Sequence, residues 1–229
     1  MFAKRLRKKF VPVSPFEHGT VAHEEFIHKH GIRYFMCGEY GESFSRPHYH
    51  AILFNFDFPD KEFYKDTDTG HKLFTSPTLN KLWDKGSCWI GAVTFDSAAY
   101  VARYVTKKIT GDMAETHYKA VHLQTGELID VEPEYADMSR KPGIGKVWFD
   151  KYAADTYPSD EVIVNARAIK PPRYYDNLYG LLDEQSLEEI KKKRKELALQ
   201  YADDNTQDRL LTKELVKLAQ FKQLKRTLE

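Results

Sequence analysis

The sequence predicts a mixed fold of the α+β class, in which helices and strands follow one another without an internal repeat. Three observations lead to this prediction. An apolar residue recurs at every fourth position of residues 2–10 among lysines and arginines, which is typical of a short amphipathic helix. Residues 32–39 and 47–56 are strand-like runs joined by a turn that contains glycine and serine. From Ser186 onward the chain is charged and helical in pattern.

Local signals place the elements between these landmarks. Residues 20–30 predict a helix that a glycine closes. Residues 57–75 are polar and charged, and we expect a loop there. Ser76 followed by Pro77 is typical of the start of a helix. The apolar stripe of this helix contains Leu79, Leu82 and Trp83.

The second half of the chain has weaker signals. Residues 88–95 predict a strand, and Asp96 or Ser97 then caps a helix that extends to about Thr110. Residues 111–145 are expected to be irregular because proline and glycine recur there. The prediction is completed by a short helix at 147–154, a strand at 162–164, a boundary at 171–172 and two charged helices broken near 203–205.

Composition bounds the class of protein without identifying it. A chain of 229 residues can bury a full core and carry an appendage. The formal net charge of +1 does not indicate a nucleic-acid partner, although basic residues cluster at 4–9 and 191–195. Such clusters are more often solvated helix faces. Cys37 and Cys88 lack zinc-type spacing and predict reduced thiols of a cytosolic protein. No apolar run approaches the ~20 residues of a membrane span, so we expect no membrane partner.

Two histidines one residue apart make a candidate metal site. His48 and His50 point to the same face of a strand, because side chains alternate along it. In a hairpin with residues 32–39, Glu39 lies opposite His48 with Cβ atoms roughly 5 Å apart, and Cys37 opposes His50. Neutral imidazoles and a carboxylate suit Mg²⁺ or Mn²⁺. The plainer alternative is a partly exposed strand whose histidines bind nothing.

Two tyrosines four residues apart make a candidate nucleophile. On a helix Tyr100 and Tyr104 share one face, which Lys107 and Lys108 extend by a turn. A tyrosine hydroxyl has an ordinary pKa of ~10, and the ammonium of Lys107 favours its phenolate. Attack on a phosphodiester then gives a covalent phosphotyrosine. The alternative is that both rings are half-buried packing residues.

Together these segments resemble the replication initiation proteins of microviruses, especially of the gokushovirus type, which belong to the HUH endonuclease superfamily. The likeness covers roughly residues 1–180. The pairing of a His-Tyr-His motif with a double tyrosine is its most specific part. The segments that carry it are 34–41, 46–51, 100–108, 141–145 with Trp148 and Phe149, and 171–175.

The resemblance implies an antiparallel sheet with flanking helices. We expect a catalytic domain at residues 1–180 and a charged helical extension at 181–229. Proteins of this type usually carry a strand of the pattern Phe-x-Thr-Leu-Thr-Tyr before the basic helix. The present sequence starts inside that helix, so we expect this strand to be missing and the activity of the chain to be less certain than its ancestry.

The resemblance also assigns roles to residues. It implies that Glu39, His48 and His50 hold a divalent metal, Mg²⁺ or Mn²⁺, and that Tyr100 and Tyr104 are the nucleophiles. Lys107 matches the lysine that follows them, and Tyr104 is the first candidate. We expect DNA contacts from Arg46, Arg103 and Lys108.

The implied activity is rolling-circle replication in the cytoplasm of a bacterial host. The protein would nick the replicative form at its origin, form a 5′-phosphotyrosine and rejoin the displaced strand. Its partners would be single-stranded and origin DNA, with the host helicase and polymerase. Two alternatives stay open: a catalytically incomplete DNA-binding or regulatory protein with the same sheet, and a transposase of the same superfamily.

Overall fold

The computed structural model describes residues 2–41, 45–122 and 124–223, except for the side chains of residues 105 and 106. The chain divides into two compact units, Met1–Arg140 and Lys141–Lys225. The boundary at residue 180 that we expect from the resemblance concerns the extent of a catalytic domain and stays a prediction. Packing divides the chain earlier, just after the last strand of the main sheet.

The first unit is built on an antiparallel sheet in the order β2-β1-β7. Its strands are β1 (Arg33–Tyr40), β2 (Pro47–Phe54) and β7 (Tyr135–Met138). The predicted hairpin and the α+β class are both confirmed. The helix predicted at 20–30 is α2 (Val21–His30), which begins where the Thr20 hydroxyl accepts a hydrogen bond from His23 N.

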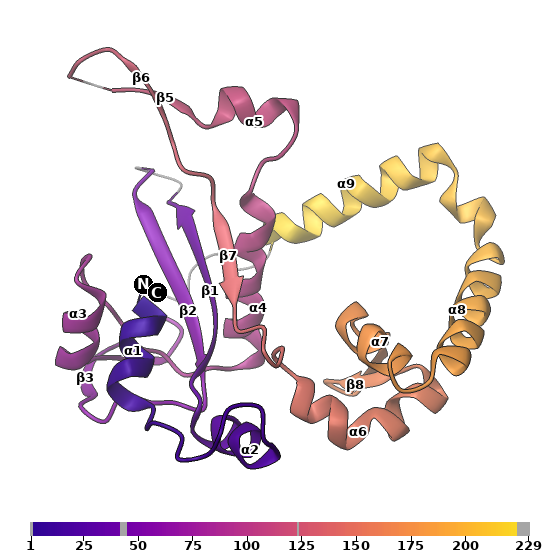
Figure 1. Cartoon of the computed structure of the whole chain (residues 1–229). Helices are drawn as coiled ribbons and strands as arrows, with labels where there is room; N and C mark the ends of the chain where they lie inside the picture. The colour runs from indigo at the N-terminus through magenta and orange to yellow at the C-terminus, as the bar shows by residue number, and fades with distance from the viewer. Residues whose placement is uncertain (1, 42–44, 123, 224–229) are drawn as a thin grey trace. The chain divides into compact units, whose positions relative to one another are not determined.

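One side of the sheet is covered by α1 (Phe2–Phe10) and α3 (Pro77–Trp83) (Figure 1). Both begin as the sequence predicts, and the Ser76 hydroxyl caps α3 by accepting from Leu79 N. The apolar stripes of the two helices meet in one cluster. Its buried members are Phe2, Leu6, Ile32, Phe58 and Leu79.

The other side of the sheet is covered by α4 (Phe95–Arg103) and the 3₁₀ turn η1 (Tyr104–Lys107). Val101 of α4 packs on Cys37 and Ile52 of the sheet. The predicted cap was wrong: the helix is capped by Thr94, whose side chain and that of Ser97 each accept from the other's backbone N–H. The 3₁₀ turn ends at Lys107, before the predicted end at Thr110.

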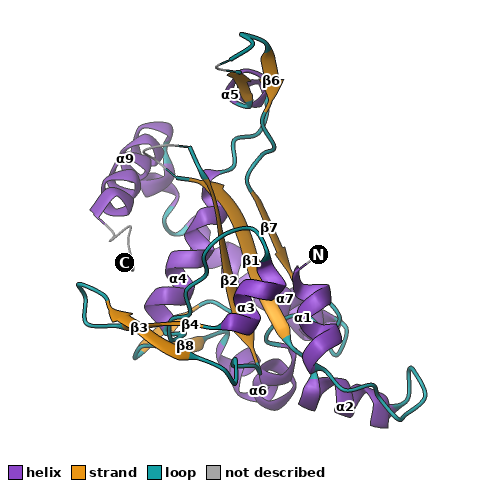
Figure 2. Cartoon of the chain, turned by 90° about the vertical axis from the view of Figure 1, so that its left-hand side faces the viewer, coloured by secondary structure: helices purple, strands orange, loops and turns teal. Residues whose placement is uncertain are grey.

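Three expectations for irregular or strand segments were wrong. The predicted loop at 57–75 contains a hairpin of β3 (Glu62–Asp66) and β4 (Lys72–Thr75), because aromatic residues pair across it where the sequence shows mainly charge. The predicted strand at 88–95 keeps a single bridge, between Ile90 and Phe74. The expected irregular segment contains, besides β7, the elements α5 (Asp112–His117), β5 (Lys119–Val121) and β6 (Leu128–Asp130). Figure 2 shows β6 extending away from the sheet.

The second unit is mainly helical. The helix predicted at 147–154 is confirmed as the longer α6 (Lys146–Ser159), the strand at 162–164 is β8 (Val162–Val164), and the helices broken near 203–205 are also confirmed. The sequence missed α7. The other elements are β9 (Arg167–Ile169), α7 (Arg173–Gly180), α8 (Glu184–Leu199), η2 (Ala202–Asn205) and α9 (Gln207–Gln223).

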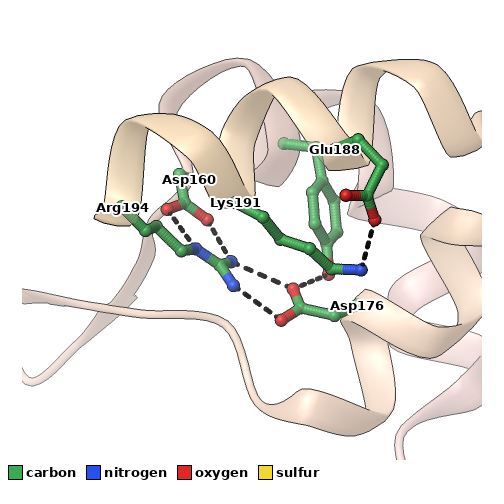
Figure 3. Close-up of polar contacts among 6 residues, drawn as sticks. Asp160, Asp176, Glu188, Lys191 and Arg194 are labelled. Atoms are coloured by element: carbon green, nitrogen blue, oxygen red, sulfur yellow. Dashed lines mark hydrogen bonds and ion pairs between the residues drawn. The ribbon is translucent and has the colours of Figure 1, made fainter. Parts of the chain in front are cut away.

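An ion-pair cluster ties the helices of this unit together (Figure 3). Arg194 of α8 donates to Asp160, at the end of α6, and to Asp176 of α7. The Tyr157 hydroxyl also donates to Asp176, at 3.0 Å. These bonds join three helices beside the buried cluster of Phe149, Tyr157 and Leu187.

Candidate active site

The hairpin of β1 and β2 brings the predicted metal ligands onto one face of the sheet. Glu39 pairs with His48 and Cys37 with His50, which confirms the register predicted from the sequence. The same face carries α4. The candidate ligands therefore lie on the side of the sheet that also receives the tyrosines.

Glu39 is the centre of the polar contacts. Its carboxylate is buried, with only 6% of the side chain exposed. Oε1 lies 3.6 Å from Nε2 of His50, and Oε2 accepts a hydrogen bond from Nζ of Lys107 at 2.5 Å. Burial lowers the pKa of His50, although the neighbouring Glu39 carboxylate opposes this shift. His50 is thus held as the neutral imidazole that metal ligation requires.

The residues fit a divalent cation in part of the predicted set. Nε2 of His50 is buried without a hydrogen-bond partner and lies beside a carboxylate, so it suits a cation at this point. His48 is exposed, and a Cβ built on Gly41 would lie 2.6 Å from Cε1 of its ring, so this ring packs over Gly41. Among the described residues no three carboxylate, imidazole or thiol groups converge closely enough to hold a metal ion. The predicted ligand set stays a prediction, with Glu39 and His50 as its adjoining members.

The two tyrosines lie directly against this cluster. Tyr100 comes from α4 and Tyr104 from the first position of η1, and the Tyr104 hydroxyl donates a hydrogen bond to the Tyr100 oxygen. The ring of His50 stacks on the ring of Tyr104, with centroids 4.4 Å apart and planes 7° from parallel. The spacing of four residues and the histidine motif therefore meet in one place.

The electrostatics of Tyr104 differ from the sequence prediction. Burial and the hydrogen bond to Tyr100 raise its pKa well above the ordinary value. The Lys107 ammonium lies 4.9 Å from the centre of the Tyr104 ring, but its hydrogen bond goes to Glu39. Since the phenol is protonated at neutral pH, attack by Tyr104 requires that its proton be removed in the same step.

The residues predicted to contact DNA are spread around this site. The guanidinium of Arg103 lies 5.5 Å from the ring centre of Tyr100, so it borders the tyrosine pair. Arg46 is exposed just before β2, and Lys108 is exposed just after η1. The sequence did not indicate the Thr94 capping arrangement or the stacking of His50, because both depend on packing that no motif records.

Comparison with known proteins places this arrangement in a class. Residues 2–109, which contain β1, β2 and both tyrosines, match the family of the replication-associated protein ORF2. This match confirms the predicted resemblance to replication proteins of small phages.

Individual relatives carry similar descriptions. The chain is 36% identical over 174 residues to "Replication-associated protein ORF2" of Spiroplasma virus 4, covering 73% of this chain and 50% of the relative. It is 35% identical over 150 residues to "Replication-associated protein VP4" of Bdellovibrio phage phiMH2K, covering 65% and 43%. Identity to "Replication-associated protein ORF4" of Chlamydia phage 1 is 26% over 155 residues, covering 64% and 35%.

The chain thus spans half or less of the length of these curated relatives. No solved structure matches it significantly. Among the described helices, none combines the length and the apolar character that crossing a membrane requires.

Proposed function

We propose that this chain is the replication initiator of a small phage and cuts single-stranded DNA at an origin through a tyrosine. The observation that carries the proposal is the contact of Tyr104 with both His50 and Tyr100, beside the Glu39 carboxylate and the Lys107 ammonium. Similarity to phage replication-associated proteins supports the replication role.

In this reaction the phenolic oxygen of a tyrosine attacks the scissile phosphorus. The P–O3′ bond breaks, the 3′ oxygen leaves as a hydroxyl after taking a proton, and the 5′ phosphate becomes linked to tyrosine. Attack of a 3′-hydroxyl on the phosphotyrosine reverses the step and joins two ends. The second tyrosine allows a new cut while the first still holds an end.

The residues of this chain divide the remaining work. His50 fixes the plane of the Tyr104 ring by stacking, and the Tyr100 oxygen is already hydrogen-bonded to the Tyr104 hydroxyl proton. Lys107 places a positive charge near the phenol as negative charge develops. Glu39 and His50, with His48, would hold Mg²⁺ or Mn²⁺, which supplies polarisation of the scissile phosphate when bound.

The partners follow from this reaction. The substrate would be origin DNA of the replicative form, copied as a rolling circle by the host helicase and polymerase in the bacterial cytoplasm. Arg46, Arg103 and Lys108 would contact its phosphates.

The test is formation of a covalent adduct. A single-stranded oligonucleotide library of random sequence is labelled at the 3′ end and incubated with protein and Mn²⁺. A 5′-phosphotyrosine transfers the label to protein that resists boiling in detergent, whereas a 5′ label stays on the released fragment. We expect the adduct in Tyr100→Phe and in Tyr104→Phe, but not in the double variant.

A matched control is Tyr64→Phe, since this tyrosine is 54% exposed on β3, outside the site. It should form the adduct as the parent does. Undiminished adduct in the double variant would refute the tyrosine assignment.

The second candidate is a DNA-binding protein without cleavage. It is favoured by the raised pKa of Tyr104, which burial causes, and by the exposed position of His48 away from a closed ligand set. A gel shift with single-stranded DNA in the absence of any adduct, in Mg²⁺ and in Mn²⁺, would select this candidate.

A further inference from the structure

The face of the sheet opposite the candidate active site carries a pair of exposed tyrosines. Tyr49 of β2 and Tyr135 of β7 are 48% and 42% exposed. Both flank Gly38 of β1, the strand between them. A Cβ built on Gly38 would lie 2.6 Å from Cε1 of Tyr135 and 3.3 Å from Cε1 of Tyr49. The glycine therefore makes room for two aromatic rings over neighbouring strands.

The helices on this side leave the pair uncovered. Figure 1 shows β1 and β2 extending past α1 and α3 toward the end of the sheet that holds the turn. Trp83, at the end of α3, meets the Tyr49 ring edge-on, with centroids 4.8 Å apart. Ala51, the next residue of β2 on this face, is also exposed. The rings thus border the helices without being buried by them.

The border of this face is positively charged. Helix α1 contains cations and no acidic residue. The guanidinium of Arg7 lies 5.0 Å from the ring centre of Tyr34, which belongs to the same sheet face. The nearby carboxylates are paired: Asp84 with Arg5, and Asp137 with Arg140. The cations of α1 are Lys4, Arg5, Arg7, Lys8 and Lys9.

We propose that this second face binds single-stranded DNA, with bases stacked on Tyr49 and Tyr135 and phosphates attracted by α1. Exposed aromatic rings beside cations are how proteins hold single strands without reading their sequence. The inference rests on the proposed function in one respect, that DNA is the partner. It adds a surface separate from the tyrosine nucleophiles, because Tyr49 and Tyr135 point to the other side of the sheet from His50.

The test measures non-covalent binding. The parent for all variants is the Tyr100→Phe, Tyr104→Phe protein, kept in a metal chelator so that no adduct forms. Anisotropy of a fluorescent single-stranded oligonucleotide of mixed sequence gives Kd. Loss of one stacking ring costs about 5- to 150-fold in affinity, so we expect at least about fivefold weaker binding for Tyr135→Ala and for Tyr49→Ala.

Matched variants separate stacking from folding. Tyr135→Phe should bind as the parent does, whereas Tyr135→Leu, which keeps apolar volume, should lose affinity as Tyr135→Ala does. Tyr64→Ala removes an equally exposed tyrosine from another surface and should change nothing. Photocrosslinking of the unmodified parent to a bromodeoxyuridine oligonucleotide should label peptides that contain Tyr49 or Tyr135, independently of any substitution at either position.

The outcomes distinguish this proposal from the nuclease. Binding by Tyr135→Leu that equals the parent, with crosslinks elsewhere, overturns the second face even if the active protein nicks DNA. Loss of binding in Tyr135→Leu in a protein that never forms an adduct keeps the second face and refutes the nuclease. If the face is covered by a protein segment instead, neither tyrosine crosslinks to DNA, and the proposal fails.

Discussion

Replacement of Lys107 by methionine should strengthen the binding of Mn²⁺ to this protein. The Lys107 ammonium donates to Oε2 of Glu39, the carboxylate that a cation at His50 would share. A cation must therefore compete with Lys107 for Glu39. A hydrogen bond between charged groups is worth about 1.5–3 kcal/mol net. Since 32% of the Lys107 side chain is exposed, solvent reduces this to about 1–2 kcal/mol, or about 5- to 30-fold in Mn²⁺ affinity.

The assay is titration of Mn²⁺ followed by electron paramagnetic resonance, in which the free ion gives the signal. Lys108→Met is the matched control, because this neighbouring lysine is exposed and makes none of the described contacts to Glu39. His50→Ala should weaken binding, since it removes the buried nitrogen beside the carboxylate. Equal or weaker Mn²⁺ affinity in Lys107→Met would show that the ion pair does not compete with the metal.

Three further changes test the folded state by urea unfolding. Leu6→Ala empties a position that is 1% exposed and should cost about 2–5 kcal/mol, whereas a cost below about 1 kcal/mol would contradict the assigned core. Ser76→Ala removes the cap of α3 and the hydrogen bond to Asp60, for about 1–2 kcal/mol, and Ser76→Thr should recover part of it. The bonds from Arg194 hold the pKa of Asp176 below its ordinary value, so stability present above about pH 4 should be lost as pH falls through the lowered pKa. Asp176→Asn should flatten this pH dependence.

The sequence predicts the hairpin and its register because each depends on local rules. The turn after β1 and the alternation of side chains place Glu39 opposite His48 without any knowledge of the remaining chain. The shared face of Tyr100 and Tyr104 follows from helical spacing in the same way. Both features survive because no distant contact competes with them.

Distant contacts explain what the sequence does not reveal. Lys107 is one turn from Tyr104 in sequence, which suggests an interaction with the phenol, but its side chain reaches a buried carboxylate on β1. The hairpin of β3 and β4 escapes detection because charged residues on exposed strands hide the pairing of Phe63 with Phe74. The raised pKa of Tyr104 arises from burial, which local spacing does not encode.

The contacts of Lys107 connect the carboxylate to the nucleophile. Its ammonium is hydrogen-bonded to Glu39 and already lies 4.9 Å from the centre of the Tyr104 ring. Release from Glu39 would leave this charge with the phenol as its nearest described acceptor, and a neighbouring cation lowers the pKa of a phenol. In the arrangement described, burial instead keeps Tyr104 protonated. On the proposed function, occupation of Glu39 by a metal and activation of Tyr104 are therefore coupled through one side chain. Lys107→Met should separate them, giving tighter Mn²⁺ binding together with slower formation of the covalent adduct.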